Sequence, residues 1–411
     1  MRVYLRTFGC RANQYDTEIV REMVTAGGAE VVDTPEAADV AVFNSCAVTA
    51  EAIVDLRKNI RRAVRQNSGL RSVVMGCAAA LDHGELAGLP SVERVIAGAD
   101  YPAVAESLQL PVGLLATRAQ AGTRGLLRIQ DGCDEHCTFC ATTVARGANR
   151  SRAEDALVDE ARQLADRHPE IVLTGIHIGT YGRDRGSSLG ALVQRLIREV
   201  PVVRYRLTSI EATEVDARLA ELFQEPDRLA PHLHAPLQSG ANRVLRRMGR
   251  HWYTAASYAR AVEAIARISP VFAIGADVIA GFPGESDEEH RETLQLVQSL
   301  PFTYLHVFPF SIRPGTPAER LADHVHGSTI AQRARDLREL AAAKEAAYRT
   351  SRAGGEADVV VVRGAEGEGL TEDYLTVMMP SVGLPRGSRV RATLSMSERQ
   401  LVASPLAAVC A

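Results

Sequence analysis

Lysine, tryptophan and long apolar runs are all scarce in this sequence of 411 residues. Lys58 and Lys344 are the only lysines, and there is a single tryptophan. No stretch of about eighteen consecutive apolar residues occurs, so no membrane-spanning helix is predicted. The first residues, MRVYLRTFGC, lack the apolar segment of a secretory signal peptide, and we expect a cytoplasmic protein with no membrane partner.

The chain also lacks a surplus of positive charge. Its formal net charge of −3 argues against a surface coated with basic residues for nucleic acid, although a local basic face remains compatible with it. Hydrophobic residues make up 46% and charged residues 24%, which is ordinary for a globular protein. Because the length exceeds what one hydrophobic core usually supports, we expect two or three domains.

Short β-branched runs alternate with helical patterns in the first part of the chain. Such alternation predicts a parallel sheet wrapped by helices. The predicted strands are 3–7, 39–45, 72–76 and 93–98, and the predicted helices include 16–27 and 50–66.

A second alternating region follows a linker rich in Gly, Ala and Pro at 109–124. Six strands at the spacing of βα units predict a partial barrel, two units short of a closed eightfold one. The predicted strands are 126–130, 171–175, 204–210, 232–237, 272–281 and 303–310, and a helix at 331–349 ends the region.

From Glu356 the pattern changes to short strand-like pieces separated by Gly-rich turns, which predicts a small β-barrel. The predicted fold class is therefore α/β, with an N-terminal parallel-sheet α/β domain, a partial (βα)6 TIM-like barrel and a small C-terminal β-barrel. We expect these domains at residues 1–115, 120–350 and 351–411.

The seven cysteines form two groups of three and one tail residue. Clustered cysteines in a reducing cytosol indicate metal binding rather than disulfides. Cys410, near the end, lacks a partner in the sequence pattern. The two groups are Cys10, Cys46 and Cys77, and Cys133, Cys137 and Cys140.

The second group has C-x3-C-x2-C spacing in the segment DGCDEHCTFCA. Three thiolates in one loop hold three corners of a [4Fe–4S] cube and leave the fourth iron open to chelate S-adenosylmethionine (SAM). The alternative is a structural zinc site. Zinc normally takes four ligands with C-x2-C knuckles, and His136 is badly placed as a fourth ligand.

This segment resembles the signature of the radical SAM superfamily, including the aromatic Phe139 before the last cysteine. One departure follows the motif. Related tRNA enzymes usually continue with a bulky aliphatic residue and a proline before an ARG triplet, whereas this chain reads ATTVARG at 141–147. The cysteines are unaffected, but the loop beside SAM differs.

The first group falls just after predicted strands, whose ends share one edge of a parallel sheet. A lone cysteine there is usually a small buried hydrophobe, but three at one edge form a candidate site. The segments TFGCRANQYDTE, FNSCAVT and VVMGCAA resemble the N-terminal domain of the methylthiotransferases. That resemblance implies a second [4Fe–4S] cluster, whose open iron carries the sulfur to be delivered.

The resemblance extends over essentially the whole chain. PHLHAPLQSGANRVLRRMGRH, IGADVIAGFPGESDEEH and LHVFPFSIRPGTPA match the family closely, with Trp252 added before the usual YT. The C-terminal barrel resembles the TRAM domain, a tRNA-binding module. The sequence around Cys10 and Cys46 resembles the branch acting on N6-threonylcarbamoyladenosine more than the branch acting on N6-isopentenyladenosine. In the ribosomal-protein branch, the first cysteine usually lies in an SLGC segment instead.

Further candidates lie at the ends of predicted barrel strands. Gly175, in TGIHIGTYG, is expected to let the backbone approach SAM, or else to form an ordinary turn. Glu211 and Gln238 are candidates for hydrogen bonds with SAM or substrate, and a solvated strand end is the alternative for each. No residue is assigned a catalytic role from the sequence.

Arginines recur at helical spacing soon after Cys46. Arg57, Arg61 and Arg65 would form a basic stripe suited to phosphates, and the alternative is a solvated charged face. Arg146 belongs to a second basic group just past the C-x3-C-x2-C motif. These four arginines are the predicted contacts with nucleic acid.

The resemblance implies a tRNA methylthiotransferase that adds a methylthio group to C2 of N6-threonylcarbamoyladenosine at position 37. One SAM would methylate the sulfur, and a radical from a second SAM would take hydrogen from C2. The implied partners are a tRNA anticodon loop and a reductant such as flavodoxin or ferredoxin. The alternatives are action on isopentenyladenosine or a ribosomal protein, and a non-catalytic iron–sulfur protein that binds tRNA.

Overall fold

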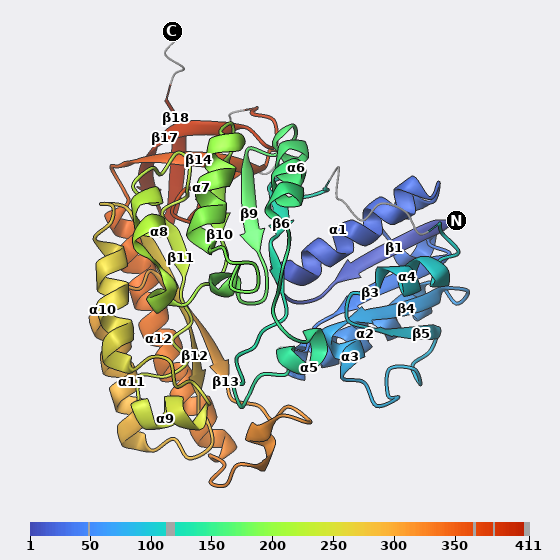
Figure 1. Cartoon of the computed structure of the whole chain (residues 1–411), viewed down its shortest axis with the longest axis horizontal. Coiled ribbons are helices and arrows are strands. Elements are labelled where there is room, and N and C mark those ends of the chain that lie inside the picture. Colours follow the sequence, from blue (N-terminus) through green and yellow to red (C-terminus); the bar gives the residue numbers. More distant parts are fainter. Residues whose placement is uncertain (48–49, 112–119, 365–366, 381–382, 407–411) are drawn as a thin grey trace.

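The computed structural model of the chain describes residues 1–47, 50–111, 120–364, 367–380 and 383–406. The centre of the predicted linker at 109–124 and Cys410 fall outside these ranges. Among the described residues, no helix is both long and apolar enough to cross a membrane. Three bodies of secondary structure follow one another along the chain (Figure 1).

The first body is a five-stranded parallel sheet in the order β2-β1-β3-β4-β5. Helices α1 and α4 pack on one face through Val20 and Val104, and α2 packs on the other through Leu56 and Ile60. The strands are β1 (Arg2–Thr7), β2 (Glu30–Val32), β3 (Val40–Ser45), β4 (Arg71–Gly76) and β5 (Val92–Ala97). The helices are α1 (Arg11–Ala26), α2 (Ala50–Gln66), α3 (Cys77–Ala80) and α4 (Tyr101–Ser107).

The second body is a partial barrel of two three-stranded parallel sheets, β10-β9-β6 and β11-β12-β13. A parallel bridge between Ser209 and His234 joins them, so six strands curve around one core. The strands are β6 (Gly125–Arg128), β9 (Glu170–Thr174), β10 (Arg204–Leu207), β11 (His232–His234), β12 (Ala273–Ala280) and β13 (Tyr304–Pro309).

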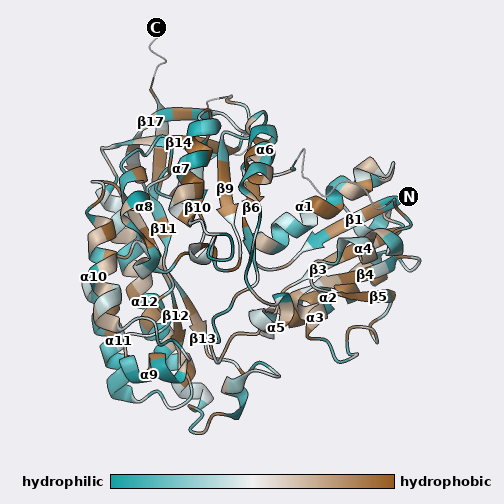
Figure 2. Cartoon of the chain, viewed as in Figure 1, coloured by the Kyte–Doolittle hydropathy of each residue, from teal (hydrophilic) through white to brown (hydrophobic). Residues whose placement is uncertain are grey.

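Helices cover the outside of this barrel, and their amphipathic patterns explain the arrangement. In Figure 2 strand β9 is mostly brown, and the covering helices carry both brown and teal segments. The helices are α6 (Glu154–Ala165), α7 (Leu189–Glu199), α8 (Ala217–Leu222), α9 (Asn242–Arg247), α10 (Ala255–Ala266), α11 (Asp287–Ser299) and α12 (Gly327–Ser351). A small hairpin, β7 (Gln130–Asp131) with β8 (Arg150–Ser151), frames a short helix, α5 (Thr142–Arg146).

The third body is a closed barrel in the order β14-β15-β16-β18-β17. Its core has ten fully packed apolar side chains, among them Val359, Val377 and Leu401. The strands are β14 (Glu356–Arg363), β15 (Glu368–Thr371), β16 (Thr376–Met378), β17 (Arg389–Ser397) and β18 (Gln400–Pro405). The predicted α/β architecture with a partial barrel and a small β-barrel is confirmed.

Three strands, β2, β8 and β15, are absent from the sequence prediction. β2 is an edge strand of only three residues, and β15 lies in a Gly-containing stretch. The predicted helix 50–66, in contrast, agrees with α2 at both ends. Short or Gly-rich strands lack enough alternating residues to be recognised, whereas α2 repeats its apolar positions over four turns or more.

A buried carboxylate joins the partial barrel to the C-terminal barrel. Glu170, at the start of β9, is fully buried and accepts hydrogen bonds from Arg204 and Arg206. Those arginines also donate to the carbonyl oxygens of Asp358 and Thr371 in the small barrel. Burial favours protonation of Glu170, but the arginines outweigh it and hold its pKa well below the ordinary value.

We expect Glu170→Gln to destabilise the protein by about 3–5 kcal/mol, because it removes the carboxylate that pairs with two buried guanidinium groups. Urea unfolding followed by circular dichroism measures the loss. The control is Asp159→Asn, which removes an exposed ion pair with Arg162 and should leave the midpoint unchanged. Equal midpoints for both variants would contradict this role for Glu170.

Candidate active site at two cysteine triads

Cys133, Cys137 and Cys140, here the SAM triad, lie in the loop between β7 and α5. All three sulfurs line one pocket of about 170 Å³ at the carboxyl ends of β9, β10 and β11. The remaining lining includes residues that follow those strands: Ile176, His177, Ser209, Ile210, Glu211, Pro236 and Gln238. Ligand sites form at this end of parallel strands, because the loops that leave the strands meet there.

Three side chains hold the SAM triad in place. The Arg250 guanidinium donates to Cys137 Sγ at 3.4 Å and pairs with Glu211. His177 Nδ1 lies 3.8 Å from Cys133 Sγ, and its Nε2 lies 2.9 Å from Glu214. Burial lowers the pKa of His177, but the contacts with Cys133 and Glu214 outweigh burial and raise it to about 10. The His177 imidazole therefore faces one thiol of the triad on one side and a carboxylate on the other.

Two polar atoms in this pocket are buried without a hydrogen-bond partner among the described residues. They are Glu211 Oε2 and Trp252 Nε1. An unpaired buried carboxylate oxygen is costly, and it normally marks a place where a ligand or water binds. Since SAM carries an amino group and ribose hydroxyls, these atoms fit a SAM-binding pocket.

Gln238 occupies the pocket with a strained backbone. Its φ of 67° is in the left-handed region, which glutamine rarely adopts. The backbone of Gln238 also forms a parallel β-bridge with Val278 of β12. Such strain persists where the surrounding structure fixes a functional side chain. Glu211 and Gln238 both line the pocket of the SAM triad, and their role in binding SAM or substrate stays a prediction.

Gly175 has a different environment from the one expected. It does not line the pocket, although its neighbours Ile176 and His177 do. A Cβ at Gly175 would lie 2.7 Å from the carbonyl oxygen of Gln130 and 2.8 Å from its side-chain oxygen. The glycine is therefore required so that the β9 loop can approach Gln130, which accepts hydrogen bonds from Ile176 and His177.

Cys10, Cys46 and Cys77, here the auxiliary triad, follow three adjacent strands, β1, β3 and β4. Asn13 on α1 lies at their centre. Its side-chain oxygen is 3.9 Å from Cys10 Sγ and 3.8 Å from Cys77 Sγ. Its nitrogen donates to the carbonyl of Ser45, directly before Cys46, and to the carbonyl of Phe8. The sheet edge thus brings the three thiols together, as the strand pattern predicts.

The absence of a side chain at Gly9 leaves space for the Cys46 side chain. The φ of Gly9 is +93°, and a Cβ there would lie 2.5 Å from Cys46 Sγ. Burial raises the pKa of the Cys77 thiol, while the adjacent Arg146 opposes the shift. Burial likewise raises the pKa of Cys137 to about 12, against the influence of Arg250. Each triad therefore has one thiol sheltered from water beside an arginine.

The spacing of the sulfurs distinguishes a cube from a single ion. Among the described residues, the group close enough to hold one ion is His234, Asp277 and His306, with ligand atoms within 4.8 Å of one another. Neither triad forms such a group, whereas four-coordinate zinc would gather its sulfurs tightly. Three thiols that are not gathered within 4.8 Å of one another are compatible with the corners of a [4Fe–4S] cube.

Direct hydrogen bonds account for the His–Asp–His group. Asp277 accepts from His234 at 2.9 Å and from His306 at 3.2 Å through the same oxygen. Burial favours protonation of Asp277, but the two imidazoles outweigh it and keep its pKa well below the ordinary value. The group therefore presents a fixed carboxylate to a neighbouring cavity.

That cavity, of about 400 Å³, is lined by residues of the partial barrel and by Glu51 of the N-terminal body. Phe139 and Gln238 line both it and the SAM-triad pocket, so the two spaces adjoin. On the other side it reaches Glu51, on the N-terminal body. Its walls combine aromatic and polar groups, namely Phe139, Phe308, Phe310, Ile279, Gln238, Asp277, Arg313 and Arg338.

The predicted basic stripe is only partly available to a ligand. Arg61 and Arg65 are exposed on α2, whereas Arg57 is half-buried and pairs with Glu85. Arg146 is buried, with 2% of its side chain exposed, and its guanidinium binds Asp16 and Asn13. The expectation that Arg146 offers its charge to a nucleic acid is therefore not met, because its partners lie within the chain.

Sequence reasoning missed Asn13, His177, Arg250 and Trp252. Asn13 stands three residues after Cys10 in NQYDTE, and Arg250 lies two residues before the added Trp252 in GRHWYT. Both segments belong to the family resemblance, and that resemblance is the signal in the sequence that could have identified these residues. No spacing rule predicts which arginine or asparagine reaches a sulfur across a domain junction.

Comparisons with known proteins agree with this geometry. The model of the radical SAM superfamily matches residues 127–297, and that of an uncharacterized protein family, UPF0004, matches residues 2–98. A solved radical SAM methyltransferase, TsrM of Kitasatospora setae, has the same fold with a TM-score of 0.59 at 14% identity, covering 77% of this chain and 75% of that one. Fold and motif define a radical SAM protein.

Curated relatives narrow the class. The threonylcarbamoyladenosine tRNA methylthiotransferase MtaB of Aquifex aeolicus is 34% identical, covering 92% of this chain and 96% of its own length. The MtaB protein of Bacillus subtilis is 37% identical, covering 79% and 76%. The chain belongs to the MtaB-type radical SAM methylthiotransferase family.

We expect Gly9→Ala to remove the iron bound at the auxiliary triad, because the new methyl group occupies the space of Cys46 Sγ. Gly28→Ala is the matched control, since Gly28 has a similar φ of +76° but nothing within 4 Å of a Cβ. Both are measured by iron and sulfide analysis after anaerobic reconstitution, with the SAM triad changed to alanine. Full iron content in Gly9→Ala would refute this reading of the loop.

Proposed function

We propose that this protein is a tRNA methylthiotransferase that adds a methylthio group to C2 of N6-threonylcarbamoyladenosine at position 37. The observation that carries the proposal is a pair of cysteine triads at strand ends of two sheets, together with a cavity that adjoins the pocket of one triad and reaches the N-terminal body. The named activity of the relatives supports the same reaction.

The residues fit two [4Fe–4S] clusters and SAM. Cys133, Cys137 and Cys140 would hold the cluster that binds SAM, and Cys10, Cys46 and Cys77 would hold the auxiliary one. When bound, these groups supply a 5′-deoxyadenosyl radical and the sulfur that is transferred. Glu211 and Gln238 would orient SAM, whereas Gly175 supports their loop from behind.

The protein's own part in the reaction is to place the base and exclude water. An aromatic C–H bond offers no proton that a side-chain base removes, so its hydrogen must be within reach of a radical. The aromatic walls at Phe139, Phe308 and Phe310 suit an adenine ring lifted out of the anticodon-loop stack. Such a base would lie between the two triads.

Exposed basic residues on α2 would meet the phosphates. Arg61 and Arg65 lie on the exposed face of this helix, which begins soon after Cys46. Arg57 would bind a phosphate only after its ion pair with Glu85 is broken. The small barrel, which resembles a TRAM domain, is the second proposed tRNA contact.

The remaining assignments follow from this reaction. We propose an auxiliary-cluster domain at 1–115, a radical SAM domain at 120–350 and a TRAM-like domain at 351–411. A one-electron reductant such as flavodoxin or ferredoxin would serve the SAM cluster. A tRNA substrate places the protein in the cytoplasm.

Cys133→Ala should abolish 5′-deoxyadenosine formation from SAM and dithionite, since it removes one of three ligands from the SAM triad. Cys46→Ala should retain that product but transfer no methylthio group to tRNA. Liquid chromatography with mass spectrometry measures both products in one assay. If Cys46→Ala still modified tRNA, the auxiliary triad would not be the sulfur-donor site.

The substrate is tested by nucleoside mass spectrometry of tRNA from a deletion strain. The methylthio form of threonylcarbamoyladenosine should disappear and return with the wild-type gene. Loss of methylthio-isopentenyladenosine instead would assign the other tRNA branch, and unchanged nucleosides would point to a protein substrate. Absence of 5′-deoxyadenosine from the fully loaded protein would favour a non-catalytic tRNA binder.

A further inference from the structure

Each cysteine triad has one buried arginine that donates an N–H group to one sulfur. Arg146 Nε lies 3.3 Å from Cys77 Sγ, and an Arg250 terminal nitrogen lies 3.4 Å from Cys137 Sγ. Their side chains are 2% and 6% exposed. Both guanidinium groups are therefore held in a water-poor environment, where charge acts strongly on its neighbours.

The position of Arg146 is unusual because it spans the two bodies of the protein. It ends α5, which directly follows the SAM triad, yet it contacts the auxiliary triad on the N-terminal sheet. Helix α5 packs against α3, the helix that begins at Cys77 (Figure 1).

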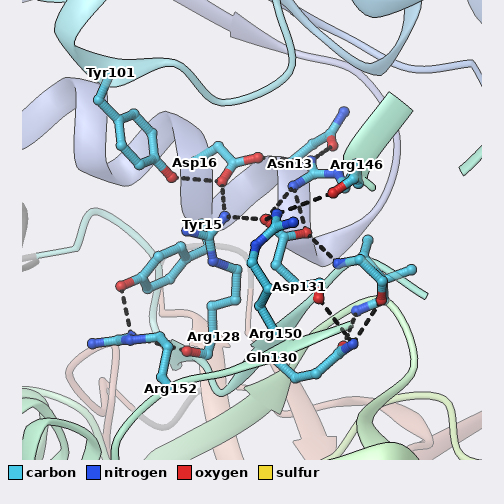
Figure 3. A network of polar contacts seen from close by, with 12 residues as sticks. Asn13, Tyr15, Asp16, Tyr101, Arg128, Gln130, Asp131, Arg146, Arg150 and Arg152 are labelled. Carbon is cyan, nitrogen blue, oxygen red and sulfur yellow. Dashed lines mark hydrogen bonds and ion pairs between the residues drawn. The ribbon is translucent and has the colours of Figure 1, made fainter. Parts of the chain in front are cut away.

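Several acceptors fix the Arg146 guanidinium in this junction. One terminal nitrogen donates to Asn13 at 2.6 Å and to Asp16 at 2.7 Å, and the other lies 3.3 Å from Asp131. Figure 3 shows Asn13, Asp16 and Asp131 grouped around it. With its terminal nitrogens engaged, Nε is left to face Cys77.

Arg250 is fixed in the same way on the other side. Its Nε donates to the Tyr253 hydroxyl at 2.8 Å, one terminal nitrogen pairs with Glu211, and the other reaches Cys137. Its guanidinium also stacks 4.8 Å from the ring of Trp252. Neither arginine is able to serve the sulfur of the opposite triad without leaving these partners.

We propose that Arg146 and Arg250 are positioning residues that set the reduction potentials of the two clusters separately, Arg146 for the auxiliary cluster and Arg250 for the SAM cluster. The inference rests on the proposed function, because it assumes a cube at each triad. The physical cause is the N–H···S contact together with the local charge.

The sign of the effect follows from charge. Reduction adds one electron to a [4Fe–4S]²⁺ cube and gives [4Fe–4S]⁺, so the reduced site carries one more negative charge. A cationic donor at a ligand sulfur stabilises that form and raises the potential. Removing Arg146 also leaves Asp16 and Asp131 less compensated beside the site, which lowers the potential further.

The test uses the full chain in two backgrounds, each with one triad changed to alanine so that one cluster remains. Potentials are measured by titration with dithionite under electron paramagnetic resonance, after iron and sulfide analysis. Arg146→Gln should shift the auxiliary cluster to a more negative potential and leave the SAM cluster unchanged. Arg250→Gln should shift the SAM cluster to a more negative potential and leave the auxiliary cluster unchanged.

Arg128→Gln is the matched control. Arg128 is a largely buried junction arginine that pairs with the same Asp16, at 2.5 Å, but it donates no hydrogen bond to a cysteine among the described residues. Its loss leaves Asp16 less compensated without removing a sulfur contact, so the auxiliary potential should become more negative by less than in Arg146→Gln. Arg146→Lys, which keeps the charge but not the fork of donors, should give a smaller negative shift than Arg146→Gln.

Wild-type potentials in Arg146→Gln, or an equal shift in Arg128→Gln, would overturn the proposal. If Arg146→Gln holds no auxiliary cluster, the Arg146→Lys variant decides the question. A wild-type auxiliary potential in Arg146→Lys would overturn the proposal, and a more negative potential would support it. These results are independent of tRNA. Failure of wild-type protein to load two cubes would instead refute the proposed function, and loaded cubes with unmoved potentials would refute this inference alone.

Discussion

The junction between Arg146 and the α1 residues Asn13 and Asp16 is the contact on which the site depends. It joins two separate parallel sheets at their carboxyl edges. Each edge alone provides three thiols and an incomplete cavity. When the edges are held together, a cavity lined by both bodies adjoins the pocket of the SAM triad.

Buried charge is used in this protein chiefly to join its parts. Glu170 with Arg204 and Arg206 attaches the small barrel to the partial barrel, and Asp16 with Arg128 and Arg146 attaches the N-terminal sheet. Such pairs contribute little net stability relative to apolar packing, but losing one partner is costly because the other charge stays buried. They therefore fix one relative orientation of the three bodies, which a site shared between bodies requires.

The local chemistry of the two triads differs although their construction is parallel. The SAM triad lies in one loop beside unpaired polar atoms, as suits a triad that also binds an organic ligand. The auxiliary triad comes from three strand ends gathered around Asn13, and Gly9 leaves space for Cys46. A loop motif is visible as spacing, whereas convergent strand ends require the fold to bring them together.

The sequence alone determined the fold class, both cysteine triads and the extent of α2, because strand alternation, helical repeats and C-x3-C-x2-C spacing are local patterns. It also placed Glu211 and Gln238 at strand ends that meet at the pocket. Only the tertiary structure decided that Arg146 faces Cys77, that Gly175 supports a loop and that Arg250 reaches Cys137. Those contacts depend on how separate sheets pack, and long-range packing leaves no periodic signature in the chain.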